Sequence, residues 1–330
     1  MKRFVEFDDA TLAAHKNNLK KHVLDELDNL VQSSVFVCPI QRRYLRRIRQ
    51  FVDECDCLIA DAKKLREMAL EIEQTYFNWE KTIPPMLGIV NDRLSQLFSY
   101  ENFRKAKKTG GDWLMRKVVS RVKYCPYCNA ETIYSLERDD MGDIKSAFDH
   151  FFPHGRYPFL ALSLYNLIPS CYRCNSQFKK AHFAETYKTF HPYIDDFDDD
   201  VEFFPKCMTM DMLEGNANSA GLEILLKPRS NTDTSVTQEK IDNYNVLFAI
   251  NTVYTQLFPE EALDILRKAK VLNEDYLEQV CKWFEGANLK VDIGRIIYNA
   301  RLDPRDIDSH RLSKLTMDLR RNCHRICNNK

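Results

Sequence analysis

Two Cys-x-x-Cys pairs constrain the fold of this 330-residue chain more than any other feature. Cys125 and Cys128 form the first pair, and Cys171 and Cys174 form the second. A gap of two residues lets two thiolates reach one ion, and two such pairs complete a tetrahedral zinc site. Because four thiolates leave no open position for a substrate, the spacing predicts a structural Zn²⁺ ion held by all four cysteines.

The remaining cysteines and the apolar pattern indicate the cellular compartment. The chain has 11 cysteines, an odd number, and its first residues lack the apolar core of a secretion signal. No stretch approaches the roughly 20 consecutive apolar residues that span a membrane. We therefore expect a cytoplasmic protein with reduced cysteines and no membrane contact.

The composition excludes several classes of protein. Lys+Arg and Asp+Glu number 48 each, so bulk charge cannot hold this chain on nucleic acid. Any such contact must come from a local patch, and the basic run at 104–123, opposed only by Asp112, is the candidate. With 9 glycines and neither the P-loop nor the dinucleotide fingerprint, the chain is not expected to be an ATPase or a Rossmann dehydrogenase.

Helical periodicity fills the N-terminal third. Apolar spacing predicts helices over 9–33, capped by Asp9 or Thr11, and over 86–105. Between them, an uninterrupted heptad pattern predicts one long helix over 41–80. That helix could pair with 9–33 as an antiparallel hairpin, or it could protrude and dock onto the coiled coil of a partner.

The C-terminal part is also predicted to be mainly helical, with helical segments between 238 and 327. The run 223–229 is predicted to be a strand. The acidic stretch 195–202 lacks the spacing of a calcium loop and is expected to be a solvated loop.

Polar residues with catalytic potential lie between and just after the cysteine pairs. Asp149 and His150 are adjacent, Asn166 precedes the second pair, and Asn175 follows its last cysteine. Histidine can be both neutral and basic near pH 7, and oxygen ligands suit Mg²⁺ or Mn²⁺. The alternative is that Asp149 caps a helix beside a surface histidine, and that Asn175 merely starts a helix.

The order of these motifs resembles the zinc-stapled branch of the HNH, or His-Me finger, nucleases. The resemblance implies a ββα-metal finger in which His150 is the general base and Asn166 pins the loop before the second strand. It also implies that Asp149 and Asn175 hold one catalytic Mg²⁺ or Mn²⁺ ion. Asn175 stands where the family name has its second histidine.

Three longer sequence segments extend the resemblance. The segments DHFFPHGRYPFLALSLYNLIPSCYRCNSQFKK, FHPYIDDF and SHRLSKLTMDLRR are similar to the HNH subunits of Septu- and retron-type anti-phage systems. That similarity implies a defence role and an ATPase partner with a coiled coil. The substrate implied is nucleic acid, with DNA favoured over RNA. The residues expected to contact its backbone are basic: Lys107, Lys108, Arg116, Lys117, Arg121, Arg156, Lys179 and Lys180.

The resulting fold prediction is an α-rich α+β protein in which a small zinc-stapled HNH finger is embedded between helical regions. The predicted regions are a helical part over 1–105, the nuclease domain over 106–190 and a mainly helical domain over 191–330. The rival function is a non-catalytic zinc module that binds nucleic acid or organises an assembly. Asp149, His150 and Asn175 distinguish the two, because a zinc ribbon needs none of them.

Overall fold

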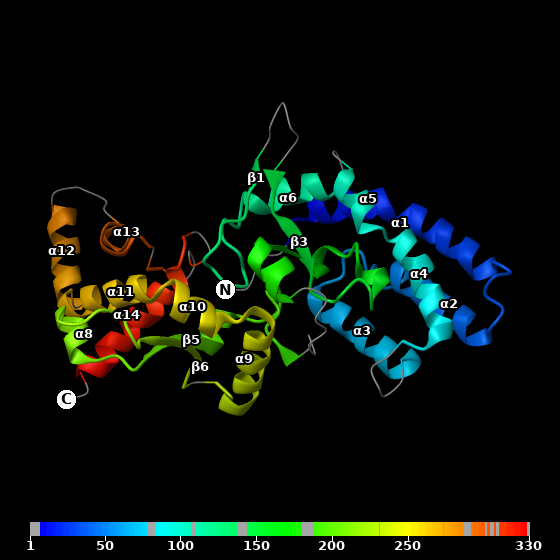
Figure 1. Ribbon diagram of the computed structural model, residues 1–330. Helices are drawn as coiled ribbons and strands as arrows, with labels where there is room; N and C mark the ends of the chain where they lie inside the picture. Colours follow the sequence, from blue (N-terminus) through cyan, green and yellow to red (C-terminus); the bar gives the residue numbers. More distant parts are fainter. Residues whose placement is uncertain are drawn as a thin grey trace. The chain divides into compact units, whose positions relative to one another are not determined.

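In a computed structural model, the chain forms two compact units (Figure 1). The N-terminal unit combines Phe4–Arg121 with Ser135–Ser170, and the C-terminal unit combines Val122–Tyr134 with Cys171–Lys330. These limits differ from the boundaries at 105 and 190 drawn from the sequence. The described residues are 7–77, 83–106, 110–136, 144–179, 188–230, 232–272, 274–286, 292–300, 302–303, 307 and 310–328.

The N-terminal unit is helical with two small antiparallel sheets. Its elements are α1 (Asp9–Gln32), α2 (Pro39–Asp53), α3 (Ala62–Tyr76), α4 (Pro85–Leu97), α5 (Tyr100–Lys105), α6 (Gly111–Val119), β1 (Ser135–Leu136), β2 (Ile144–Lys145), β3 (Ala147–His150) and β4 (Leu167–Ser170). The predicted helix 9–33 is confirmed as α1, although its cap is Asp8, whose carboxylate accepts from Thr11 N at 2.7 Å. The predicted helix 86–105 is divided into α4 and α5, and Ser99 caps the second part.

The prediction of one long helix over 41–80 is wrong. The chain leaves α2 after Asp53, and Asp56 takes a left-handed backbone conformation with φ 48°. Asp61 then caps α3 by accepting from Lys64 N at 2.8 Å. A heptad pattern shows which face of a helix is apolar, but it does not show whether the helix is continuous. The apolar spacing stays the same on both sides of this turn, so the sequence pattern did not reveal the break.

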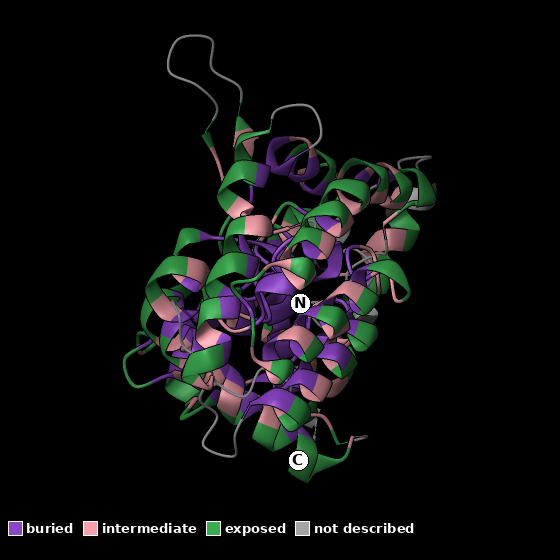
Figure 2. Ribbon diagram, turned by 90° about the vertical axis from the view of Figure 1, so that its right-hand side faces the viewer, coloured by how far each residue is buried: buried purple, intermediate pink, exposed green. Residues whose placement is uncertain are grey.

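The seam of that heptad pattern is buried by the N-terminal unit itself. Ile48, Leu65 and Ile72 are completely inaccessible to solvent. Helices α1 and α4 pack on α2, and the turn Leu164–Asn166 packs on α3. Figure 2 shows this division of the helices into buried and exposed faces. The predicted pairing of 9–33 with 41–80 therefore holds only for α1 and α2, and the described part of the seam is covered by the chain itself rather than left as a protruding arm.

The hairpin β3–β4 carries the predicted catalytic dipeptide. The two strands are antiparallel, with Asp149 opposite Ile168 and His150 opposite Leu167. Sixteen residues connect them, from Phe151 to Asn166, and include short 3-10 turns at Pro158–Leu160 and Leu164–Asn166. The apolar residues of this connection form a core that includes Phe151, Phe152, Tyr157 and Phe159.

In the C-terminal unit, helices surround an antiparallel pair of strands (Figure 1). Helix α10 packs on β6, and α14 packs on β5 and α11. Strand β6 confirms the predicted strand at 223–229. The elements are a π-helical turn at Arg173–Lys179, α7 (Phe197–Asp200), β5 (Val201–Lys206), α8 (Met210–Glu214), β6 (Glu223–Pro228), α9 (Thr234–Phe248), α10 (Ile250–Leu257), α11 (Pro259–Val271), α12 (Glu274–Gly286), α13 (Ile293–Tyr298) and α14 (Ser313–Asn328).

The expectation of a solvated acidic loop at 195–202 is also wrong. Asp198 and Glu202 are buried in α7 and β5. Lys314 of α14 donates to Asp198 Oδ1 at 2.7 Å and pairs with Asp318 Oδ2 at 2.7 Å. Arg229 pairs with Asp318 Oδ1 at 2.6 Å and with Glu202 Oε2 at 3.3 Å. The stretch therefore supplies Asp198 and Glu202 to a buried ion network that joins α7, β5 and α14.

The helix-rich α+β character of the prediction is confirmed, with small sheets in both units. In the described part of the chain, no helix combines the length and the apolar composition needed to cross a lipid bilayer.

Candidate metal centre and candidate active site

The first cysteine pair lies in a tight turn of the C-terminal unit. Asn129 N donates to Cys125 O at 2.7 Å, and Cys125 N donates to Glu131 O at 2.8 Å. Asn129 adopts φ 51°, a left-handed conformation that asparagine tolerates better than most residues. This turn is the local geometry that brings two thiols separated by two residues to the same side of the chain.

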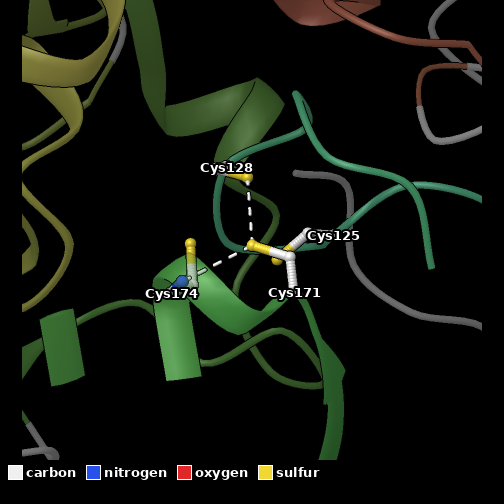
Figure 3. A group of neighbouring side chains, drawn as sticks. All are labelled: Cys125, Cys128, Cys171 and Cys174. Atoms are coloured by element: carbon white, nitrogen blue, oxygen red, sulfur yellow. Dashed lines mark hydrogen bonds between the residues drawn. The ribbon is translucent and has the colours of Figure 1, made fainter. Parts of the chain in front are cut away.

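The second cysteine pair completes a four-sulfur cluster (Figure 3). All four sulfur atoms lie within 4.8 Å of one another, and all four residues are buried. Cys128 Sγ and Cys171 Sγ are 3.9 Å apart. Tetrahedral zinc with bonds of about 2.3 Å requires sulfur–sulfur separations of roughly 3.8 Å, so the arrangement fits the predicted ion.

Four cysteine thiolates in one buried cluster would also need a cation to balance their negative charge. Burial raises the pKa of the Cys125 thiol well above its ordinary value, whereas hydrogen bonds from Cys125 and the other two thiols lower the pKa of Cys128. Four buried thiolates without a counterion would repel one another. A bound Zn²⁺ removes that repulsion, because it takes up thiolates rather than thiols.

The surrounding helices hold the first cysteine pair through its backbone. Tyr244 of α9 donates its hydroxyl to Tyr127 O at 2.6 Å, and Tyr254 of α10 donates to Cys128 O at 2.5 Å. Tyr127 stacks on Phe248, with ring centroids 4.2 Å apart. The four-cysteine cluster is therefore built into the core of the C-terminal unit.

A second link joins the same turn to the approach of α14. Asn129 donates to Ile307 O at 3.1 Å and accepts from Lys314 N at 3.3 Å. Asn129 O accepts from Leu312 N at 2.9 Å. The turn that contains Cys125 and Cys128 is thus hydrogen-bonded to the start of α14, the helix that contributes Lys314 and Asp318 to the buried ion network.

Asp149 and His150 end strand β3 in the N-terminal unit, and both are buried. His150 Nε2 lies 2.9 Å from Ala161 O, a carbonyl of the long connection between β3 and β4. The Tyr100 ring meets the His150 ring edge-on at 4.6 Å, and burial raises the pKa of Tyr100 to about 12. His154, which is exposed, lies with its ring centroid 4.9 Å from that of His150.

Asn166 holds the connection between the strands, as the resemblance implied. Its Oδ1 accepts from Phe152 N at 2.7 Å. Its Nδ2 donates to Phe152 O at 3.1 Å and to Leu160 O at 2.9 Å. Since Asn166 is fully buried, these three bonds fix the loop that carries the Ala161 carbonyl.

The helices of the N-terminal unit hold the same loop from outside. Glu73 of α3 forms an ion pair with Arg156 and accepts from the Tyr157 hydroxyl at 2.6 Å. Leu164 N donates to Leu58 O at 2.9 Å. Arg156 was expected to contact a phosphate backbone, but its guanidinium is largely buried against Glu73, so its observed contacts are structural.

The other predicted basic contacts have different environments. Arg116 and Lys117 are exposed on α6, and Arg121 is exposed and paired with Asp8 at 2.8 Å. Lys179 is buried, which does not fit the expected solvent-facing phosphate contact. The remaining three positions lie outside the described residues: Lys107, Lys108 and Lys180.

Asn175 belongs to the C-terminal unit, next to the cysteine cluster. It lies in the turn Arg173–Lys179, is partly exposed, and its backbone N donates to Cys171 O at 3.0 Å. The predicted site residues thus fall into two groups. One group contains the cysteines and Asn175, and the other contains Asp149, His150 and Asn166.

Several residues that shape these groups were not found from the sequence. Tyr244 and Tyr254 support the cysteine turn, and Glu73 supports the loop after His150. They come from helices far away in the sequence, and a tyrosine or glutamate in a helix is ordinary. A single sequence carries no signal that would have distinguished them.

Two known proteins are partly similar to this chain. Protein ea31 of Escherichia phage lambda is 32% identical over 127 residues, which is 36% of this chain and 39% of that protein. The Septu protein PtuB of Bacillus thuringiensis is 29% identical over 129 residues, which is 36% of this chain and 50% of that protein. The matches span half or less of either relative. No family model and no solved structure matches the sequence.

Proposed function

We propose that this chain is a metal-dependent HNH-type endonuclease that hydrolyses phosphodiester bonds in nucleic acid, with DNA as the favoured substrate. The observation that carries the proposal is the setting of His150. It ends a β-strand beside a buried carboxylate, and its ring is held by a backbone carbonyl in a loop fixed by Asn166.

The hydrogen bond to Ala161 O determines which nitrogen of His150 is basic. A carbonyl oxygen can only accept, so Nε2 carries the proton and Nδ1 is the acceptor nitrogen of the neutral ring. In the proposed reaction, Nδ1 takes a proton from a water molecule. The water oxygen attacks phosphorus, and the bond from phosphorus to the leaving oxygen breaks.

The chemistry of the ligands suits a catalytic Mg²⁺ or Mn²⁺ ion. Asp149 offers a carboxylate oxygen, a hard ligand that leaves room for waters and phosphate oxygens, while the amide oxygen of Asn175 stays a prediction from the resemblance. When bound, the ion would stabilise negative charge on the phosphate and on the leaving oxygen. The four cysteines are sulfur ligands that suit zinc and serve the structural site.

The similarity to the Septu protein PtuB supports a role in anti-phage defence. An ATPase partner with a coiled coil is part of the same proposal. The apolar seam of α2 and α3 is buried within the chain, so such a partner would use another surface. Arg116 and Lys117, exposed on α6, are proposed to contact the nucleic-acid backbone.

Cleavage assays with purified full-length chain test the proposal. Plasmid DNA and total RNA are incubated with the chain alone and with the products of neighbouring genes, with and without added Mg²⁺. His150→Ala is expected to slow Mg²⁺-dependent cleavage by about 10²–10⁴-fold while zinc content stays the same, because removing a general base has that cost. His22→Ala, which changes an exposed histidine on α1, is the matched control and should cleave like the wild type.

Two results would contradict the proposal. Equal cleavage by wild type and His150→Ala would mean that His150 is not the base. Nucleic-acid binding that needs zinc, with no cleavage under any of these conditions, would favour the non-catalytic zinc module.

A further inference from the structure

Two imidazole rings hold adjacent carbonyl groups in the loop between β3 and β4. His150 Nε2 lies 2.9 Å from Ala161 O. His15 Nε2, from helix α1, lies 2.7 Å from Leu162 O. Both histidines belong to the N-terminal unit, and they hold the carbonyls of two successive peptide groups of this loop.

The state of His15 makes it a fixed hydrogen-bond donor. The side chain is completely buried, and burial lowers its pKa to about 4 although the bond to Leu162 opposes that shift. Near pH 7 the ring is therefore neutral and has one N–H group. Because a carbonyl oxygen can only accept, that N–H is on Nε2 and points at Leu162 O.

Stability alone does not explain a histidine at this position. Nδ1 of His15 is buried and has no hydrogen-bond partner among the described residues. An unsatisfied buried acceptor destabilises a fold, and a leucine of similar size would avoid that penalty while keeping the packing against Phe103. The histidine keeps one property that leucine lacks, which is the N–H group directed at Leu162 O.

We propose that His15 is a positioning residue for His150. By holding the Leu162 carbonyl, it fixes the peptide group that directly follows the one carrying the Ala161 carbonyl, and the Ala161 carbonyl in turn holds His150 in one tautomer and one ring orientation. Asn166 fixes the same loop at Leu160, so the two contacts bracket the carbonyl that His150 needs. The kinetic consequence rests on the proposed nuclease function, whereas the structural consequence does not.

Three substitutions separate positioning from packing. His15→Leu removes the donor and keeps the volume. His15→Gln keeps an N–H group at a similar distance from the backbone. His15→Asn keeps an amide that is too short to reach Leu162 O, and it serves as the loss variant if the leucine variant does not fold. His22→Leu, on the exposed face of the same helix, is the control.

The first measurement is the nitrogen spectrum of the His150 ring in the full-length chain, at one pH near 7, with the signal assigned by loss in His150→Asn. Wild type should show one tautomer with the proton on Nε2. His15→Leu and His15→Asn should show averaged tautomers, and His15→Gln should restore most of the wild-type signal. Identical His150 signals in all variants would overturn the inference, whether or not the chain cleaves nucleic acid.

The second measurement is cleavage kinetics. His15→Leu should lower kcat by about 10–100-fold with little change in KM, since a small misplacement of a catalytic group has effects of this size. Its Tm should equal or exceed that of the wild type. A fall in Tm with no recovery in His15→Gln would assign His15 to packing alone and would also overturn the inference. Failure of the wild type to cleave would remove the nuclease proposal, and the nitrogen spectrum would still decide the role of His15.

Discussion

At the scale of single residues, the side chain of Asn166 ties two points of the loop between β3 and β4 together. Its amide makes three bonds to the backbone, and no other side-chain type has both the acceptor and the paired donors at that length. We expect Asn166→Leu to lower the free energy of unfolding by about 2–4 kcal/mol, because it leaves buried backbone groups without partners. Urea unfolding measures this change, with Asn102→Leu on the exposed surface of α5 as the control. A loss under about 0.5 kcal/mol would show that water or loop rearrangement satisfies those groups.

The cysteine cluster could be predicted from the sequence because the spacing of the two cysteine pairs is characteristic of a metal site. The two cysteine pairs converge as their spacing indicated, and Asn166 pins the loop. The pairing of Arg156 with Glu73 could not be predicted, because a basic residue in this segment looks the same in the sequence whether it faces a phosphate or a carboxylate. Only the folded structure shows which of the two partners Arg156 has, because Glu73 is far from it in the sequence.

At the scale of secondary-structure elements, composition predicted where helices occur but not where they stop. The seam through 41–80 is apolar on one face, yet α2 ends after Asp53, Asp56 turns the chain with φ 48°, and Asp61 caps the start of α3. Lys16 and Lys20 of α1 bind the Asp56 carboxylate at 2.9 and 2.6 Å, and so stabilise the turn from another helix. Such tertiary support outweighs helix propensity and is absent from local sequence patterns.

The buried ion network gives an element-scale prediction. Although burial opposes ionisation of Asp198, Lys314 and Arg229 lower its pKa below the ordinary 3.8. A carboxylate with a lowered pKa in the folded state stabilises the fold above its unfolded-state pKa, and that contribution is lost as the pH falls through the folded-state value. Asp198→Asn should therefore cost about 3–5 kcal/mol near neutral pH, since breaking a buried pair strands its partner, and less in acid.

Unfolding by urea at several pH values measures this prediction. The difference in stability between wild type and Asp198→Asn should be constant from pH 7 to about 5 and should shrink below about 4. Asp199→Asn, in the same turn but exposed, is the control and should change stability by less than about 0.5 kcal/mol. A difference that is independent of pH down to the acid transition would show that the Asp198 charge is not what stabilises the network.

At the scale of the whole molecule, the chain passes repeatedly between its two units. The segment Val122–Tyr134 leaves the N-terminal unit to place one cysteine pair in the C-terminal core, and Ser135–Ser170 returns to the first unit with the proposed catalytic pair. The predicted nuclease domain over 106–190 is therefore shared between two cores. The sequence alone could not predict this division, because no local sequence feature indicates whether a segment packs in the first core or in the second.

This distribution predicts an uneven response to loss of zinc. The cluster is tied through Tyr244, Tyr254 and Asn129 to α9, α10 and the start of α14, so it belongs to the C-terminal core. Because metal binding in such sites contributes directly to folding, Cys125→Ser or Cys174→Ser should remove zinc and unfold much of that unit. Helices α1 and α2 pack on each other in the other unit and should keep their structure.

Hydrogen exchange read residue by residue measures this pattern. Amide protection in α9, α10 and α14 should fall by several orders of magnitude in Cys125→Ser, while protection in α1 and α2 should change by less than about tenfold. Cys207→Ser alters an exposed cysteine and should leave zinc content and exchange at wild-type values. Uniform loss of protection in both units would mean that the two cores fold as one cooperative structure. Unchanged protection with unchanged zinc would mean that Cys125 does not bind the ion.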